Sequence, residues 1–184
     1  NPKSGDKWRK LIHLSEEEMK QLITGIVMKR LGEEKPEDVL GNIYLLTDEE
    51  EESVTKDARE FATLLNACGR LEKASFGIGA CLGIESDKNQ AIKVLEEYKK
   101  EIVNAINWYE ENKESANVIK GNNYIIINAK DNILSTIIGT LASMVSKSKD
   151  IKEGTYIMSL ARTKDNMIKV SLRVSGQRND NNCI

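Results

Sequence analysis

The sequence predicts an α+β or α/β protein, built from an N-terminal helical segment, a long connecting helix and a small α/β domain that is truncated at its C-terminus. Two observations carry this prediction. Apolar residues recur at helical spacing as far as Lys113, whereas the continuous and alternating apolar runs typical of strands appear from Val118 onwards. We place the helical segment at residues 1–52, the connecting part at 53–116 and the α/β domain at 117–184.

The first predicted helix follows Ser15. Ser15 is a favourable N-cap with Glu18 three positions later, which is the pattern of a capping box. The apolar residues after it keep one stripe at helical spacing, which predicts a face packed on a core: Met19, Leu22, Ile23, Ile26, Val27 and Leu31. We interpret Met28 as a packing residue too, and Gly32 as the end of the helix. His13, the one histidine, reads as a capping or partly buried residue.

A second helix is expected after the acidic run at residues 48–52, which reads as a solvated face. Ser53 can cap this helix. Its core-facing residues are predicted to be Val54, Ala58, Phe61, Ala62 and Leu65. We expect Gly69 to break the helix, and a short helix to follow from Ser75 to Leu82 before Gly83 ends it.

One long helix is predicted from Asp87 to Lys113. Its broad apolar stripe consists of Ala91, Val94, Leu95, Tyr98, Ile102, Ala105, Ile106 and Tyr109. At about 1.5 Å per residue, such a helix is on the order of 40 Å long. This length suffices to connect two domains.

The last third of the chain predicts a strand, a helix and a hairpin. The apolar run Tyr124 to Ile127 suits a strand buried on both faces. Asn132 can cap a helix that packs on this strand, with the apolar residues Ile133, Leu134, Ile137, Ile138, Leu141, Met144 and Val145. Two further strands, Thr155 to Ala161 and Met167 to Ser175, are joined by the turn-rich residues 164–166. This order of elements predicts a small α/β domain.

The final strand alternates between two kinds of side chain. Lys169, Ser171, Arg173 and Ser175 point to one face of the sheet, and Ile168, Val170, Leu172 and Val174 point to the other. Hydroxyl and guanidinium donors on an open sheet face are suited to anionic oxygens. Spacing alone favours the plainer alternative of an ordinary solvated face.

Composition excludes several classes of function. The net charge of −2 favours no partner, although residues 33–60 are acidic and residues 152–178 are basic. The three cysteines form no Cys-x-x-Cys pair and have no histidine nearby, which argues against a zinc site and for a reducing, cytoplasmic location. No stretch has the roughly 20 apolar residues of a membrane span. No phosphate-binding loop, nucleophile motif or metal-ligand cluster gives the chain an active site of its own.

Two motifs resemble the DHH phosphoesterase superfamily, and specifically archaeal RecJ-like proteins, the group that includes the GINS-associated nuclease. The first is Asn66-Ala67-Cys68-Gly69-Arg70-Leu71, inside the segment from Asp57 to Gly83. The second is the strand with Ser171, Arg173 and Ser175, which is similar to the family's Gly-Ser-x-Arg-Ser strand. The resemblance covers roughly residues 54–176 and identifies residues 117–184 as a C-terminally truncated DHH-associated domain.

The resemblance implies a phosphate-binding role for a set of six residues: Asn66, Arg70, Lys169, Ser171, Arg173 and Ser175. Gly69 would permit a tight turn that points Asn66 and Arg70 toward the metal site and the phosphates. The alternative, Asn66 as a helix cap and Arg70 in a surface ion pair, stays open. The Asp-rich and Asp-His-His motifs expected upstream are missing, and so is the Gly-Gly-x-x-His motif expected after Ile184. No catalytic or metal-binding residue is therefore assigned here, and Mn²⁺ or Mg²⁺ is implied only for the full-length protein.

The resemblance implies the substrate-gripping part of a RecJ-like exonuclease specific for single strands. The expected partners are single-stranded nucleic acid, with GINS or other replication proteins, and no membrane. One alternative is a non-catalytic replication scaffold that binds GINS and MCM through residues 33–60 and the helix at 16–31. Another is a phosphodiesterase for small oligonucleotides or cyclic dinucleotides. The chain alone is expected to cleave nothing.

Overall fold

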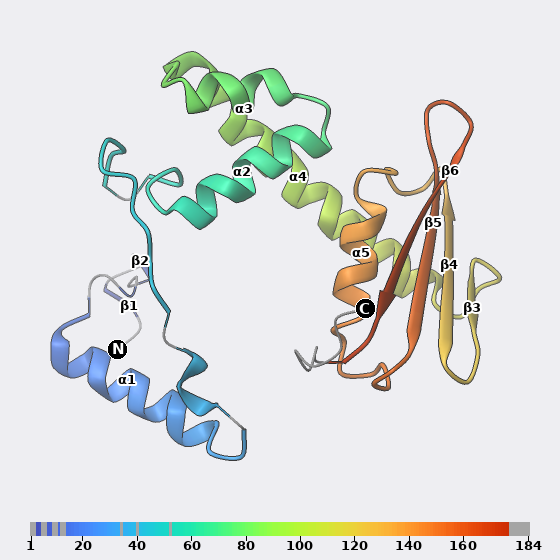
Figure 1. Ribbon diagram of the computed structural model, residues 1–184, viewed down its shortest axis with the longest axis horizontal. Helices are drawn as coiled ribbons and strands as arrows, with labels where there is room; N and C mark the ends of the chain where they lie inside the picture. Colours follow the sequence, from blue (N-terminus) through green and yellow to red (C-terminus); the bar gives the residue numbers. More distant parts are fainter. Residues whose placement is uncertain are drawn as a thin grey trace, which may run out of the picture. The chain divides into compact units, whose positions relative to one another are not determined.

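The computed structural model describes residues 3–4, 7–8, 11, 14–33, 35–39, 41–51 and 53–176 (Figure 1). The chain divides into two compact units, Asn1–Leu45 and Leu46–Ile184. The described residues form α-helices and a four-stranded mixed sheet, which confirms the predicted α+β class. None of the described helices combines the length and the apolar character needed to cross a bilayer.

The first unit contains a short antiparallel pair, β1 (Lys3–Ser4) with β2 (Lys7–Trp8), the helix α1 (Glu16–Lys29) and the 3₁₀ turn η2 (Pro36–Val39). The predicted capping box is confirmed. The Ser15 hydroxyl accepts from the Glu18 amide at 3.2 Å, and the Glu18 carboxylate accepts from the Ser15 amide at 3.0 Å.

The predicted packing of the α1 stripe is seen only in part: Met19, Ile23, Ile26 and Val27 are half-buried, whereas Leu22 and Leu31 are exposed. No residue of α1 is buried, and Met28 is 61% exposed. The capping box and the acidic first turn stabilise the helix locally without a core behind it. The interpretation of His13 concerns a residue outside the described part of the chain.

The second unit begins with α2 (Ala58–Arg70), which differs from the prediction at both ends. Its N-cap is Asp57, whose carboxylate accepts from the amides of Arg59 and Glu60, so the predicted cap at Ser53 is wrong. Gly69 lies inside the helix and does not break it. The left-handed residue after the helix is Glu72, at φ 60°, so the expected tight turn at Gly69 is wrong as well. Leu64, Ala67 and Cys68 bury the helix's inner face, and this packing outweighs the weak helix propensity of one glycine.

Two helices follow α2 and pack against it: α3 (Ala74–Cys81) and α4 (Glu85–Asn112). The predicted short helix and its end at Gly83, with φ 75°, are confirmed. The predicted long helix is confirmed, and most of its stripe is buried: Ala91, Val94, Leu95, Tyr98, Ala105 and Tyr109. Gly79 allows α3 to approach α4 closely, since a Cβ there would lie 1.9 Å from Asp87 Oδ2.

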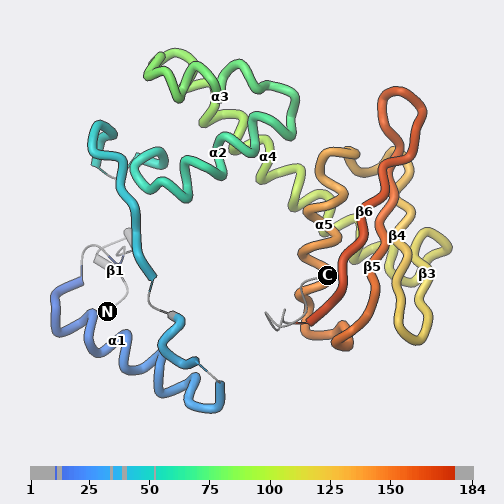
Figure 2. Tube along the Cα trace, in the orientation of Figure 1, coloured from blue at the N-terminus to red at the C-terminus, as the bar shows by residue number. Residues whose placement is uncertain are grey.

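The sheet has the order β3-β4-β5-β6 and encloses one parallel pair. Its strands are β3 (Val118–Lys120), β4 (Tyr124–Lys130), β5 (Tyr156–Arg162) and β6 (Ile168–Val174). β4 and β5 are parallel and are joined through α5 (Ile138–Val145), a path that Figure 2 traces, whereas the other pairs are antiparallel. Asn132 does not cap α5. Its side chain instead donates to the Ala129 carbonyl in a turn, and the helix begins after Ile137.

Helices cover one face of this sheet. α5 packs against β5 and β6, and α4 packs against α5. β4 buries Ile125 and Ile127 on the covered face, but Tyr124 is exposed, so the predicted burial of this strand on both faces is wrong. We call the other side, with no described helix packed on it, the open face.

The final strand is oriented opposite to the expectation. Ser159 pairs with Ser171, and Ile157 pairs with Arg173, which places the polar row of β6 on the side covered by α5. The apolar row lies on the open face and is more than half exposed: Ile168, Val170, Leu172 and Val174. The predicted open polar face is therefore wrong. Gly139 and Ser143 make the polar row compatible with α5, because they are small and Ser143 is a hydrogen-bonding partner.

Candidate nucleic-acid interface

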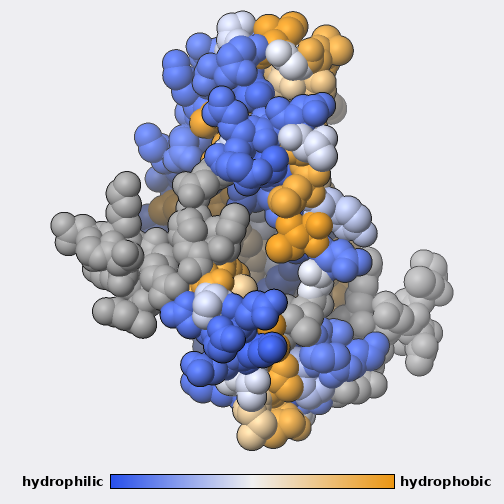
Figure 3. All heavy atoms as spheres, turned by 90° about the vertical axis from the view of Figure 1, so that its left-hand side faces the viewer, coloured by the Kyte–Doolittle hydropathy of each residue, from blue (hydrophilic) through white to orange (hydrophobic). Residues whose placement is uncertain are grey.

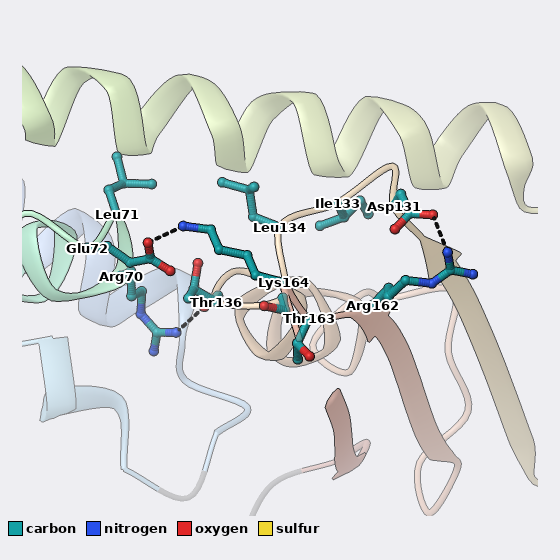
Figure 4. Close-up of a pocket in the computed structure, with 11 residues that line it drawn as sticks. Arg70, Leu71, Glu72, Asp131, Ile133, Leu134, Thr136, Arg162, Thr163 and Lys164 are labelled. Carbon is teal, nitrogen blue, oxygen red and sulfur yellow. Dashed lines mark hydrogen bonds and ion pairs between the residues drawn. The ribbon is translucent and has the colours of Figure 1, made fainter. Parts of the chain in front are cut away.

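A cleft of about 250 Å³ lies where β4 and β5 end (Figure 4). Because these strands are parallel, their carboxyl ends meet at one edge of the sheet, which is the usual place for ligands in such sheets. α2 contributes its C-terminal end to the same cleft. Its lining consists of Arg70, Leu71, Glu72, Asp131, Ile133, Leu134, Ser135, Thr136, Arg162, Thr163 and Lys164. We call it the strand-end cleft.

Arg70 is the last residue of α2 and is held at the cleft by a single contact. Its Nη1 donates to the Thr136 carbonyl at 2.7 Å, across 66 residues of sequence. The side chain is half-buried, and it forms no ion pair with any residue that the structure describes. A guanidinium has five donors, so several stay available to an anionic oxygen. Among the described residues, Arg70 therefore does not form the surface ion pair that was the alternative interpretation.

Two further cations line the cleft, each beside a carboxylate. Arg162 Nη1 lies 3.4 Å from Asp131 Oδ2, and Lys164 pairs with Glu72. All four side chains are more than half exposed. Exposed ion pairs of this kind contribute about 0–1 kcal/mol, so a phosphate can replace the carboxylate at little cost.

Sequence reasoning did not select Arg162 and Lys164 as site residues. Both belong to the basic region 152–178, and they lie one and three residues after Ala161, the last predicted residue of a strand. That position was the available signal, because residues after parallel strands converge at one edge of a sheet. The sequence predicts only an antiparallel hairpin around Arg162 and Lys164. This hairpin does not predict that Asp131, in the connection after β4, pairs with Arg162.

The start of α5 adds a favourable field. Ser135 and Thr136 line the cleft immediately before the helix, whose first residue is Ile138. The N-terminal end of a helix carries partial positive charge and favours anions. The strand-end cleft therefore combines three cationic side chains with the partially positive N-terminal end of α5.

Arg173 lies beside α5. Its Nε donates to Ser143 Oγ at 2.9 Å, and a Cβ added to Gly139 would lie 3.7 Å from its Nη2. Gly139 is three residues after Thr136, the partner of Arg70, so about one helical turn separates the two contact points. Arg173 does not line the cleft, because its strand partner Ile157 is five residues before Arg162 and its hydrogen-bond partner Ser143 is seven residues after Thr136. Ser171 reaches the same glycine, with its Oγ 3.2 Å from that added Cβ.

The other three selected residues do not line the cleft either. Ser175 is buried and its hydroxyl joins two backbone groups, accepting from the Thr155 amide and donating to the Lys152 carbonyl. These bonds give Ser175 a structural role in closing the end of the hairpin. Lys169 is exposed at the start of β6, opposite Ala161 and so next to the cleft residue Arg162, but it does not line the cleft. Asn66 is exposed in α2, one turn before Arg70, and does not line the cleft or cap the helix.

The motif that contains Arg70 is divided between core and surface. Ala67 and Cys68 are buried, while Asn66 and Gly69 are exposed. Burial raises the pKa of the Cys68 thiol, which keeps it protonated and unreactive. The motif's apolar members therefore build the contact of α2 with its neighbours, and Arg70 alone reaches the cleft.

The described residues include no group of three or more His, Cys, Asp or Glu side chains placed to hold a metal ion. The two carboxylates of the cleft, Glu72 and Asp131, are each paired with a cation. The part of the chain that the structure describes therefore does not fit the Mn²⁺ or Mg²⁺ that the family resemblance implies.

Comparison with known proteins identifies no family for this chain. No protein-family model matches it, and no curated protein matches it significantly. The family resemblance accordingly rests on the two motifs, and the function on the geometry of the strand-end cleft.

Proposed function

We propose that this chain is the substrate-gripping part of a RecJ-like exonuclease that acts on single-stranded nucleic acid. The single observation that carries the proposal is Arg70, held by the Thr136 carbonyl at the mouth of a cationic cleft and free of carboxylate partners among the described residues. Backbone phosphate is the ligand that suits such a group, because a guanidinium donates two parallel hydrogen bonds to its oxygens.

The grip would involve the phosphates and not the bases. Arg70 lines the cleft just before α5, Arg173 lies beside α5, and Arg162 and Lys164 can exchange their carboxylates for phosphate. The cleft lining includes no aromatic side chain on which a base could stack. Binding of this kind is weakly selective for sequence and strongly dependent on salt.

Hydrolysis belongs to the full-length protein in this proposal. The metal ions of the family would activate water and stabilise the leaving oxygen. The described residues offer no ligands for them, so the role assigned to this chain is to hold and orient the strand. The chain alone is expected to show no metal-dependent cleavage of a single-stranded oligonucleotide. Cleavage that persists after rigorous removal of contaminating nucleases would contradict this division of roles.

The proposal is tested by fluorescence anisotropy with a labelled, 5′-phosphorylated oligothymidylate across a salt series. We expect weak binding whose affinity falls linearly with salt on logarithmic axes. Arg70→Ala and Arg173→Ala should each weaken binding several-fold at low salt and make the salt dependence less steep, because each removes one phosphate contact.

The matched control is Lys93→Ala, which removes an exposed cation of α4 outside the cleft. It changes the net charge as much as the arginine variants do, but should leave affinity nearly unchanged. If all three variants lose affinity equally, the attraction is a general effect of charge and the cleft is not the site. If the parent does not bind even at low salt, the proposal fails.

The replication scaffold remains a second candidate because of α1. No apolar side chain of this helix is fully buried within the described structure, and Leu22 and Met28 are exposed, as is Leu31 just after the helix. An amphipathic helix without a core is a common docking element for partner proteins. Capture of purified GINS by the parent, lost in Met28→Glu but kept in Arg70→Ala, would favour this candidate over the nuclease.

A further inference from the structure

The open face of the sheet is an apolar surface of unusual extent. Its most exposed large side chains come from all four strands: Ile119, Tyr124, Tyr156, Ile168, Val170, Leu172 and Val174. A separate group of exposed hydrophobic residues belongs to the region of α3 and includes Ile78 and Leu82. α3 lies at the top of Figure 1, and hydrophobic residues are visible at the upper end of Figure 3. We propose that the open face is the interface through which two copies of this chain form a symmetric dimer.

The side chains of the open face form continuous rows across the strands. One row runs through Ile119, Ile126, Met158 and Leu172, and the next through Tyr124, Tyr156 and Val174. Directly opposed residues of this kind touch one another, so each row is a ridge of apolar atoms. Such a surface has the regular shape of the inner face of a β-sandwich, where two sheets pack about 10 Å apart.

Charge favours a second copy over a charged partner. The only charged residue in register with these rows is Arg162, at the end of β5, and Asp131 is already its partner. A surface with almost no charge gives a nucleic acid or an acidic protein nothing to pair with. It is complementary to an equally uncharged apolar surface, and a two-fold axis supplies one by placing the same face opposite itself.

The area agrees with a dimer. At about 100 Å² for each half-exposed aliphatic or aromatic side chain, the seven residues expose on the order of 700 Å². The partly buried neighbours Ile126, Met158 and Leu160 add to this area. A stable interface buries about 800 Å² per partner, and a typical monomer exposes no patch beyond about 300–600 Å². The open face is therefore large for a monomer and close to what one half of a dimer needs.

The proposed dimer goes beyond the phosphate-gripping role and does not depend on it. Arg173 and α5 lie on the covered side of the sheet, and Arg70 comes from α2. Two copies packed through their open faces would leave these groups accessible on the outer sides of the assembly. The dimer could then hold two strands, or two segments of one strand.

Sedimentation velocity of the purified chain, from about 1 to 200 µM, tests the proposal. The monomer mass is 20.7 kDa, and we expect the chain to reach twice that mass as concentration rises. Val170→Glu places a charge within the apolar row of β6 and should raise the dimer dissociation constant at least about 100-fold. The control is Val103→Glu on α4, since Val103 is 54% exposed and Val170 is 55% exposed. The control should dimerise like the parent.

Two results would overturn the proposal. The first is a parent chain that stays monomeric throughout this range, which needs no variant and no assumption about variant folding. The second is a dimer that Val170→Glu leaves intact or that Val103→Glu disrupts equally. Circular dichroism of each variant checks its fold, and Val174→Lys, at the end of β6, repeats the test if Val170→Glu is unfolded. Restoration of the dimer at high salt would indicate a charge effect, and would also count against an apolar interface.

Discussion

Cys68 and Arg70 are two residues apart in one motif, yet they have opposite surroundings. Cys68 is 1% exposed and packs in the core, while Arg70 crosses to the Thr136 carbonyl. The helix places them about 200° apart around its axis, which is enough to separate core from surface. The motif looks like one functional unit in the sequence, but in the structure Cys68 belongs to the packing face of α2 and Arg70 faces the cleft.

The environments of the two described cysteines predict different reactivity. Burial raises the pKa of Cys68, so the thiol stays protonated at neutral pH, whereas Cys81 is exposed. In a Cys183→Ser background, a thiol reagent at pH 7.5 should modify the exposed Cys81 rapidly. It should modify the buried Cys68 only when the chain unfolds. Peptide mapping by mass spectrometry identifies the modified residue. Rapid modification of Cys68 in the folded chain would contradict the packing of α2.

Two glycines should respond in opposite ways to alanine. Gly69 has no atom within 4 Å of an added Cβ and has a helical backbone, so Gly69→Ala should raise the free energy of unfolding by about 0.5–1 kcal/mol. Gly79→Ala should lower it by about 1–3 kcal/mol, because the new Cβ meets Asp87 Cβ at 2.5 Å as well as its carboxylate. Urea unfolding measures both. A destabilised Gly69→Ala would revive the turn that the sequence predicted.

At the scale of elements, the acidic segment before α2 is more than a solvated face. The Glu49 carboxylate accepts from the Thr55 hydroxyl and from Lys88 Nζ, the latter at 3.0 Å. Thr55 is fully buried, and both members of the ion pair are mostly buried. These contacts tie the segment to α4, across 39 residues of sequence, and hold the entry into α2.

This tie predicts a pH-dependent contribution to stability. The hydrogen bond from Thr55 and then that from Lys88 lower the pKa of Glu49, so its contribution is present above the ordinary carboxyl pKa and is lost as pH falls through the lowered value. Glu49→Gln should reduce the free energy of unfolding by about 1–2 kcal/mol at pH 7 and by much less at pH 3. Urea unfolding at the two pH values measures the difference.

Glu51→Gln is the control for this prediction. Its carboxylate pairs with Lys56 but is 75% exposed, so its removal should change stability little at either pH. An equal loss in Glu49→Gln at pH 7 and pH 3 would show that the lost interaction is not that of an ionised carboxylate.

The same elements show what could be predicted from the sequence. The helices at 16–29 and 85–112 were predictable because a capping box or a long apolar stripe specifies them locally. The starts of α2 and α5 were not, because Ser53 and Asn132 are good caps whose hydrogen bonds go elsewhere. Several residues before a helix have side chains that could cap it. Tertiary packing determines where the helix begins and therefore which of them does.

At the scale of the whole molecule, the orientation of β6 was the largest error. Its alternation was read correctly, but nothing in one strand says which row faces a helix. α5 presents Gly139 and Ser143 to the polar row, which leaves the apolar row on the open face. The proposed dimer would restore the rule that apolar rows face a core, with that core shared between two chains.

The strand-end cleft was also only partly predictable. The family resemblance pointed to Arg70, which lines the cleft, and to Arg173, which lies beside α5 without lining the cleft. Selecting Arg162 and Lys164 would have required knowledge that β4 and β5 pair in parallel. This pairing depends on the crossover through α5 and cannot be predicted from the residues of either strand alone. Ser175 was selected by the motif, but its hydroxyl is used by the backbone.

The most direct test of the phosphate-gripping cleft is an NMR titration of the isotope-labelled chain with a 5′-phosphorylated oligothymidylate at low salt. We expect the largest backbone amide shifts at Ser135, Thr136, Thr163 and Lys164, and their loss in Arg70→Ala. Shifts confined to α1 or to the open face, or shifts at the cleft that persist unchanged in Arg70→Ala, would contradict it.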